Sequence, residues 1–105
     1  MVRVVLDFRQ TDSSVVAVRR AGGTSTFQTL NAYFTISQMI IVGSSYWNVG
    51  YGMNKQEVLK DAEGLQTMRN LGKNMAWLLK SISAARSTVK EPNTKPEVLT
   101  NFIRD

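Results

Sequence analysis

The sequence predicts an α/β domain with a short, mainly parallel sheet of about three strands and two or three helices. Runs rich in β-branched residues at Val2–Phe8, Ser14–Arg19 and Met39–Gly43 are typical of strands. Apolar residues recur at helical spacing over 24–36 and again from about Asp61. Because strands alternate with helices, right-handed βαβ units and a parallel sheet are favoured.

The first helix is expected to follow a glycine turn. Ala21-Gly22-Gly23 form a flexible turn, and Thr24, Ser25 and Thr26 offer hydroxyls that can cap a helix N-terminus. Phe27 and Phe34 then repeat on one helical face, so this helix is expected to run to about Ile36. The segment from Ser44 to Asn54, which follows the next strand, is polar and aromatic and is expected to be a loop.

The second helix is expected to begin near two acidic residues. Asp61 and Glu63 favour the positive end of a helix dipole, which explains them without catalysis or a metal site. Gly64 and Gly72 are expected to allow close packing on the sheet. The apolar stripe of this helix consists of Leu65, Met68, Leu71, Met75, Leu78, Leu79 and Ile82.

One domain is expected over residues 1–85, followed by a C-terminal tail over 86–105. The tail is polar and contains Pro92 and Pro96. A short final helix could form over Val98–Ile103.

The composition excludes several classes of function. The chain of 105 residues has no cysteine and no histidine, so disulfides, thiolate or imidazole metal sites and Ser-His or Cys-His catalysis are excluded. Chemistry carried by carboxylates, hydroxyls, lysine or a cofactor remains. The net charge is +5, but the basic residues are scattered and only Arg19 and Arg20 are adjacent, which is typical of a solvated surface. No nucleic acid, no membrane and a cytoplasmic location are therefore expected.

Ligands of parallel α/β sheets bind beyond the carboxyl ends of the strands. This rule places Arg20–Thr24 and Ser44–Gly52 on the same rim of the sheet. The two loops also have the least ordinary composition of the chain. The geometry of the predicted fold therefore nominates this rim as a binding site.

Three motifs then suggest a family: RRAGGTSTF after one strand, MIIVGSSYW in the next, and Asp-x-Glu-Gly-Leu-x-Thr-x-x-x-Leu-Gly over Asp61–Gly72. Over roughly residues 15 to 82, the chain resembles the C-terminal half of NAD(P)H-dependent FMN reductases. The closer branch contains the iron-sulfur flavoproteins and the WrbA-like multimeric flavodoxins. The resemblance implies a partial flavodoxin-like three-layer sandwich.

The resemblance also implies what this chain lacks. Such flavoproteins hold the FMN phosphate in a Ser/Thr/Gly-rich loop after their first strand, whereas Val2–Phe8 leads straight into the next strand. The phosphate loop and the cysteine cluster of the iron-sulfur branch are missing, so a truncated chain is expected. Loss of the first strands would leave one edge of the sheet without a hydrogen-bonded neighbouring strand. A homodimer or higher homo-oligomer that shares strands or helix faces is therefore expected.

The cofactor that the resemblance implies is FMN, with NAD(P)H and an electron acceptor as partners of an active protein. No catalytic residue is expected, because the cofactor carries the chemistry. The glycines can also be an ordinary turn, and the two aromatic residues can also be lids or oligomer contacts. The residues expected to bind FMN are Arg20, Ala21, Gly22, Gly23, Thr24, Ser44, Ser45, Tyr46 and Trp47.

Three functions of different classes stay open from the sequence. The first is an FMN-dependent oxidoreductase domain that passes electrons from NAD(P)H to a quinone, another flavin or an iron-sulfur partner. The second is a non-catalytic remnant that acts as an oligomeric structural or interaction module. The third, a small basic nucleic-acid binder, rests on charge alone.

Overall fold

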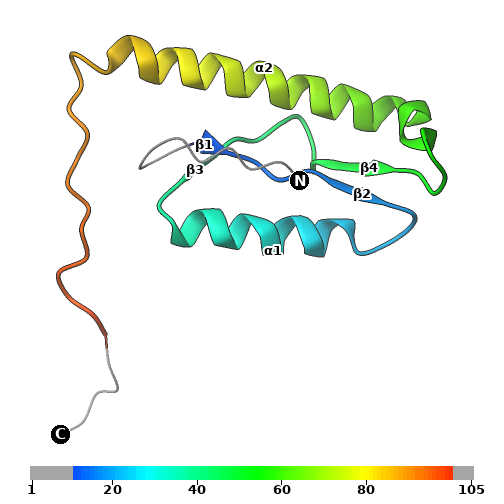
Figure 1. Cartoon of the computed structure of the whole chain (residues 1–105), viewed down its shortest axis with the longest axis horizontal. Helices are drawn as coiled ribbons and strands as arrows, with labels where there is room; N and C mark the ends of the chain where they lie inside the picture. Colours follow the sequence, from blue (N-terminus) through cyan, green and yellow to red (C-terminus); the bar gives the residue numbers. More distant parts are fainter. Residues whose placement is uncertain (1–10, 101–105) are drawn as a thin grey trace, which may run out of the picture.

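The structure, a computed structural model, describes residues 11–100. In this part of the chain, two α-helices alternate with four short strands (Figure 1), which confirms the expected α/β class. The strands pair in parallel in two small sheets. β1 (Thr11–Asp12) pairs with β3 (Ile40–Ile41), and β2 (Val16–Val18) pairs with β4 (Val49–Tyr51).

The two small sheets are consecutive stretches of the same pair of neighbouring strands. β1 leads into β2 through residues 13–15, and β3 leads into β4 through residues 42–48. Backbone hydrogen bonds continue on both sides of the gap, from Val42 N to Asp12 O at 3.0 Å and from Val16 N to Asn48 O at 2.9 Å. The strand expected at 14–19 therefore pairs through β2 with β4, and the strand expected at 39–43 pairs through β3 with β1. The two expected segments belong to neighbouring strands but do not pair directly with each other.

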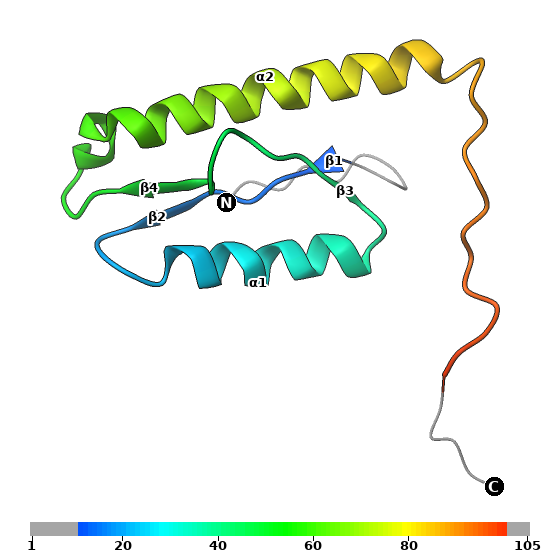
Figure 2. The same cartoon turned by 180° about the vertical axis from the view of Figure 1, so that it is seen from behind.

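The helices cover opposite faces of the strands, which gives three layers (Figures 1 and 2). α1 (Gly23–Ile36) lies against β2 and β3, and α2 (Ala62–Ala85) lies against β4. α1 begins after Gly22, whose φ of 86° is a left-handed conformation that glycine adopts without strain. Gly23 is buried, and a Cβ added there would lie 2.7 Å from Val49 Cγ1. The close approach of α1 to the sheet therefore requires a glycine at this position.

A carboxylate joins the end of β4 to the start of α2. Asp61 is the N-cap of α2, and its two side-chain oxygens accept hydrogen bonds from Gly64 N and Tyr51 N, both at 2.9 Å. These backbone N–H groups stabilise the charged form, so they lower the pKa of Asp61 below its ordinary value. The expected structural role of Asp61 at the helix start is confirmed. A short 3₁₀ helix, η1 (Glu57–Lys60), precedes it.

The core is small. Its buried apolar side chains in the described part of the chain are Phe34, Val42, Val49 and Leu71. Of the expected α2 stripe, Leu71 is buried and Leu79 is exposed, while the other members are partly buried. The expectation for Gly72 is wrong, because a Cβ at this position would have no neighbour within 4 Å.

The structure differs from the sequence prediction at three further places. β4 lies inside the segment that was expected to be a loop. Residues 91–100 form neither helix nor strand, and the rest of the expected final helix lies outside the described residues. The expected strand Val2–Phe8 also lies outside them. Among residues 11–100, no helix is long and apolar enough to cross a bilayer.

Candidate functional site

The two loops expected on one rim lie at different levels of the sheet. Gly52 N donates to Val18 O at 3.0 Å, so the chain after β2 turns away beside residues 51–52. Ser44–Trp47 lie further back, between β3 and β4. The prediction of a shared rim therefore fails for Ser44–Trp47, although Gly52, the last residue of the same predicted loop, lies beside Val18 at the end of β2. The physical cause of the failure is that the second strand does not end at Gly43 but resumes as β4.

The predicted residues of the glycine turn form the entry to α1. Gly22 O accepts hydrogen bonds from Thr26 N at 3.0 Å and from the hydroxyls of Ser25 and Thr26 at 3.1 and 2.8 Å. Gly23 is buried against the sheet, while Arg20, Ala21, Gly22 and Thr24 are exposed. None of these five residues lines either of the two concavities described below.

The other predicted residues do come together. Ser44, Ser45, Tyr46 and Trp47 line a concavity of about 380 Å³, with Phe27, Gly43 and Asn48 as its other walls. The Trp47 ring centroid lies 6.3 Å from that of Phe27 and 5.9 Å from that of Tyr46. Trp47 remains 50% exposed and Tyr46 64% exposed, so aromatic faces are available to a ligand. We name this concavity the 43–48 pocket.

A buried amide supports the floor of the 43–48 pocket. Asn48 is 0% exposed and lies where both strands are interrupted. Its Nδ2 donates to Ser13 Oγ at 2.9 Å and to Ser14 O at 3.0 Å. Its Oδ1 accepts from Ser44 Oγ at 2.5 Å. Asn48 therefore replaces part of the missing strand pairing and fixes the start of the loop to the neighbouring strand.

α2 holds the same loop from the opposite face. Asn70 Nδ2 donates to Ser45 Oγ, and Asn74 Nδ2 donates to Gly43 O, both at 2.9 Å. Sequence reasoning missed Asn48, Asn70 and Asn74, because asparagine carries no chemical motif by itself. It also assigned Phe27 only to the helix. The spacing of Asn70 and Asn74, four residues apart on one helix face, could have indicated that both contact the same loop.

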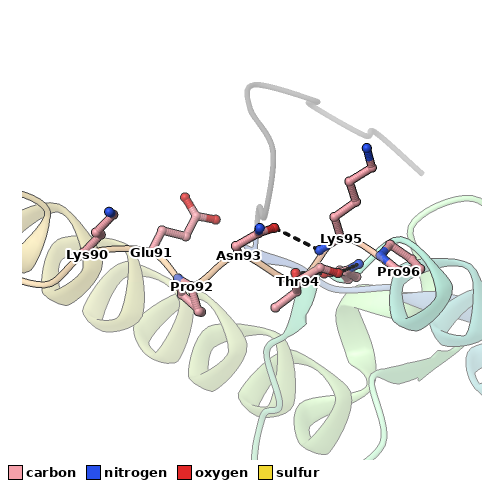
Figure 3. Close-up of a pocket in the computed structure, with 8 residues that line it drawn as sticks. Lys90, Glu91, Pro92, Asn93, Thr94, Lys95 and Pro96 are labelled. Atoms are coloured by element: carbon pink, nitrogen blue, oxygen red, sulfur yellow. Dashed lines mark hydrogen bonds between the residues drawn. The ribbon is translucent and has the colours of Figure 1, made fainter. Parts of the chain in front are cut away.

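A second concavity lies beside the C-terminal tail (Figure 3). It has a volume of about 830 Å³ and is lined by Gln38 and residues 90–96. Gln38 Nε2 donates to Thr94 O at 3.2 Å, and the Thr94 hydroxyl donates to Gln38 Oε1. None of the predicted site residues lies there.

The chemistry of the 43–48 pocket fits the ring of a flavin. Its volume lies at the lower end of the range of small-molecule sites, and its walls combine aromatic faces with the Ser45 hydroxyl. Within residues 11–100 its lining contains no Lys or Arg, so the described part of the pocket offers no basic partner to a phosphate. An iron-sulfur cluster does not fit this chain, since the 105 residues contain no cysteine to ligate it.

The comparisons with known proteins lead to the same group. The chain is 34% identical over 89 residues to the iron-sulfur flavoprotein MJ1083 of Methanocaldococcus jannaschii. The match covers 77% of this chain and 46% of that protein, so the chain spans about half the length of the relative. No family model matches the chain, and no solved structure matches it. The resemblance read from the motifs is confirmed: this chain is a distant relative of an iron-sulfur flavoprotein.

Proposed function

We propose that this chain provides the flavin-ring half of an FMN-dependent oxidoreductase domain of the NAD(P)H:flavin or quinone reductase type. Bound FMN would supply the transfer of reducing equivalents from NAD(P)H to an acceptor. The observation that carries the proposal is the 43–48 pocket, which gathers four of the predicted flavin-contacting residues in a relative of an iron-sulfur flavoprotein.

The residues of the pocket would bind and orient the ring. Trp47 offers a half-exposed face for stacking, and Phe27 backs this face from α1. The Ser45 hydroxyl already accepts a hydrogen bond from Asn70, so its own hydrogen is available to a carbonyl of the ring. Asn48 and Asn74 keep the loop in place beneath these contacts.

The alternative function is a non-catalytic module that retains only part of the flavoprotein fold. One observation favours it: among the described residues, no basic side chain lines the pocket to anchor the FMN phosphate. Affinity would then depend on ring contacts alone. The two functions differ in a measurable quantity, the dissociation constant for FMN.

Tryptophan fluorescence can test the proposal, because the chain has two tryptophans in different places. Trp47 lines the pocket, whereas Trp77 lies on α2 and is 70% exposed. FMN should quench the fluorescence of the Trp77→Phe variant, in which Trp47 is the reporter, in a saturable manner. The matched Trp47→Phe variant should show only the linear loss expected from absorption by FMN.

Purified protein should also be examined for flavin absorbance after reconstitution with FMN. Absence of saturable quenching at high micromolar FMN in the Trp77→Phe variant would support the non-catalytic module instead. Equal quenching of both variants would place the flavin away from the 43–48 pocket.

A further inference from the structure

Helix α2 contacts the loop of the 43–48 pocket through two asparagines one helical turn apart. Asn70 Nδ2 donates to Ser45 Oγ, and Asn74 Nδ2 donates to Gly43 O, both at 2.9 Å. Neither asparagine lines the pocket. Their spacing of four residues places both on the helix face that meets the loop. They can therefore influence a bound ligand through the loop groups that they contact.

The two contacts differ in the chemistry of the acceptor. The carbonyl oxygen of Gly43 can only accept hydrogen bonds, so the bond from Asn74 holds the loop without changing what this group offers to a ligand. The Ser45 hydroxyl can either donate or accept. Because Asn70 donates to its oxygen, the hydroxyl hydrogen is directed away from Asn70. Ser45 is exposed and can donate this hydrogen to a group in the pocket.

Other acceptors of the same loop are engaged within the chain. The side-chain oxygen of Asn48 and the carbonyl oxygen of Tyr46 accept hydrogen bonds from the Ser44 hydroxyl. The carbonyl oxygen of Trp47 accepts from Val49 N at 2.7 Å. The indole N–H of Trp47 can only donate. The lining of the pocket therefore favours a ligand that accepts hydrogen bonds over one that donates them.

We propose that Asn70 is a positioning residue, which fixes the Ser45 hydroxyl as a hydrogen-bond donor toward the ligand. The 43–48 pocket thereby selects aromatic rings whose edge presents a carbonyl oxygen. The flavin ring, which carries carbonyl groups, is one ligand of this class. The inference rests on the proposed function only in taking the flavin ring as the ligand, because Asn70 contacts Ser45 in the chain without it.

Replacement of Asn70 by aspartate separates this role from a purely structural one. The aspartate carboxylate has about the size of the asparagine amide but only accepts hydrogen bonds. In Asn70→Asp, Ser45 therefore keeps the contact but donates its hydrogen to the carboxylate instead of the ligand. Asn70→Ala removes the contact and leaves the hydroxyl free to turn toward the ligand. A structural role predicts that Asn70→Ala is the more damaging change, whereas a positioning role predicts that Asn70→Asp is.

Riboflavin is the first probe, because it carries the flavin ring without a phosphate that a new carboxylate could repel. Quenching of Trp47 fluorescence in the Trp77→Phe chain measures its dissociation constant. Asn70→Asp should raise this constant about tenfold, whereas Asn70→Ala should change it less than about threefold. The matched control for charge is Gln66→Glu, which makes the same amide-to-carboxylate change at an exposed position one turn earlier on α2. It should also change the constant less than about threefold.

Ser45→Ala completes a double-mutant cycle with Asn70→Asp. If Asn70 acts through the Ser45 hydroxyl, Asn70→Asp should have no further effect on riboflavin affinity in the Ser45→Ala chain. Circular dichroism checks that each variant folds. An equal loss of affinity with and without the Ser45 hydroxyl would overturn the proposal, because the new charge would then act on the ligand directly.

A second pair of probes tests the selectivity for a carbonyl group without a flavin. Naphthoquinone and naphthalene share the same fused rings, but only the quinone carries carbonyl oxygens. The chain has no cysteine with which the quinone could react. In amide NMR titrations at residues 43–48, the original chain should bind naphthoquinone about threefold to tenfold more tightly than naphthalene. Asn70→Asp should abolish this preference, and Asn70→Ala should retain it.

The two probes distinguish failure of this proposal from failure of the proposed function. Riboflavin that binds the original chain and Asn70→Asp equally well would overturn the role of Asn70 and leave the proposed function intact, because Ser45 would then donate to Asn70. Absence of riboflavin binding, with a preference for naphthoquinone that Asn70→Asp abolishes, would refute the proposed function and support the role of Asn70. An original chain that binds neither riboflavin nor naphthoquinone better than naphthalene would overturn both.

Discussion

Replacement of Asn48 by alanine is expected to destabilise the fold more than its position in a loop suggests. The side chain is fully buried and bridges both strand interruptions. Asn48→Ala removes the hydrogen bonds to Ser13 Oγ, Ser14 O and Ser44 Oγ.

The expected decrease in the free energy of unfolding follows from these contacts. A hydrogen bond contributes about 1 kcal/mol net, and a buried polar group left without a partner costs about 1–3 kcal/mol. Ser13 Oγ and Ser44 Oγ still donate to the carbonyls of Val42 and Tyr46, so the loss of their hydrogen bonds to Asn48 is only moderately destabilising. The buried Ser14 carbonyl loses the Asn48 amide. The expected decrease in the free energy of unfolding is therefore about 3–4 kcal/mol.

Urea and thermal unfolding followed by circular dichroism measure this decrease. For a domain of this size the melting temperature should fall by about 12–30 °C. Asn74→Ala is the matched control, because it removes one exposed hydrogen bond to Gly43 O and should cost about 1 kcal/mol or less. A loss for Asn48→Ala no larger than that of Asn74→Ala would refute the structural role of Asn48.

Three further predictions concern other parts of the fold. Gly23→Ala should destabilise the protein by about 1–3 kcal/mol, because its Cβ would lie 2.7 Å from Val49 Cγ1. Gly72→Ala has free space for its Cβ and should stabilise α2 by about 0.5–1 kcal/mol. Chemical denaturation measures both changes in the free energy of unfolding. Because the pKa of Asp61 is lowered in the folded state, its carboxylate contributes stability that is complete above about pH 4 and is lost as the pH falls through this lowered pKa. Asp61→Asn should therefore reduce the acid sensitivity of the melting temperature. The reduction should be partial, because hydrogen bonds from the backbone N–H groups of Asn54 and Met53 also lower the pKa of Glu57. Riboflavin and FMN should bind with affinities within about threefold of each other, since none of the described residues that line the 43–48 pocket is basic. A much tighter FMN complex in calorimetry would contradict this.

The helices could be predicted from sequence because their features are local. The recurrence of apolar residues predicted α1 and its end near Ile36, whereas the expected caps at 24–26 were wrong, because the N-cap is Gly22 and it has no side-chain cap hydrogen bond. Asp61 marked the start of α2, since a carboxylate at this position satisfies free backbone N–H groups. These interactions involve residues close in sequence, which a pattern can reveal.

The strands and the site could be predicted only in part because they depend on contacts distant in sequence. β4 contains Gly50 and follows a polar, aromatic segment, so composition indicated a loop. The role of Asn48 arises from Ser13 and Ser14, which are more than 30 residues away. Ser44–Trp47 line one concavity because they are contiguous, whereas their binding of a flavin stays a prediction. The pairing of β2 with β4 separated them from the glycine turn, and nothing in either motif revealed this register.

Binding of the flavin ring in the 43–48 pocket is the proposal on which the function of this chain depends. The most direct measurement is an amide NMR titration of the isotopically labelled chain with FMN. The largest shift changes are expected at residues 43–48 and at Phe27, with little change at Gln38 and residues 90–96. Changes concentrated at Gln38 and residues 90–96, or no saturable change at all, would contradict it.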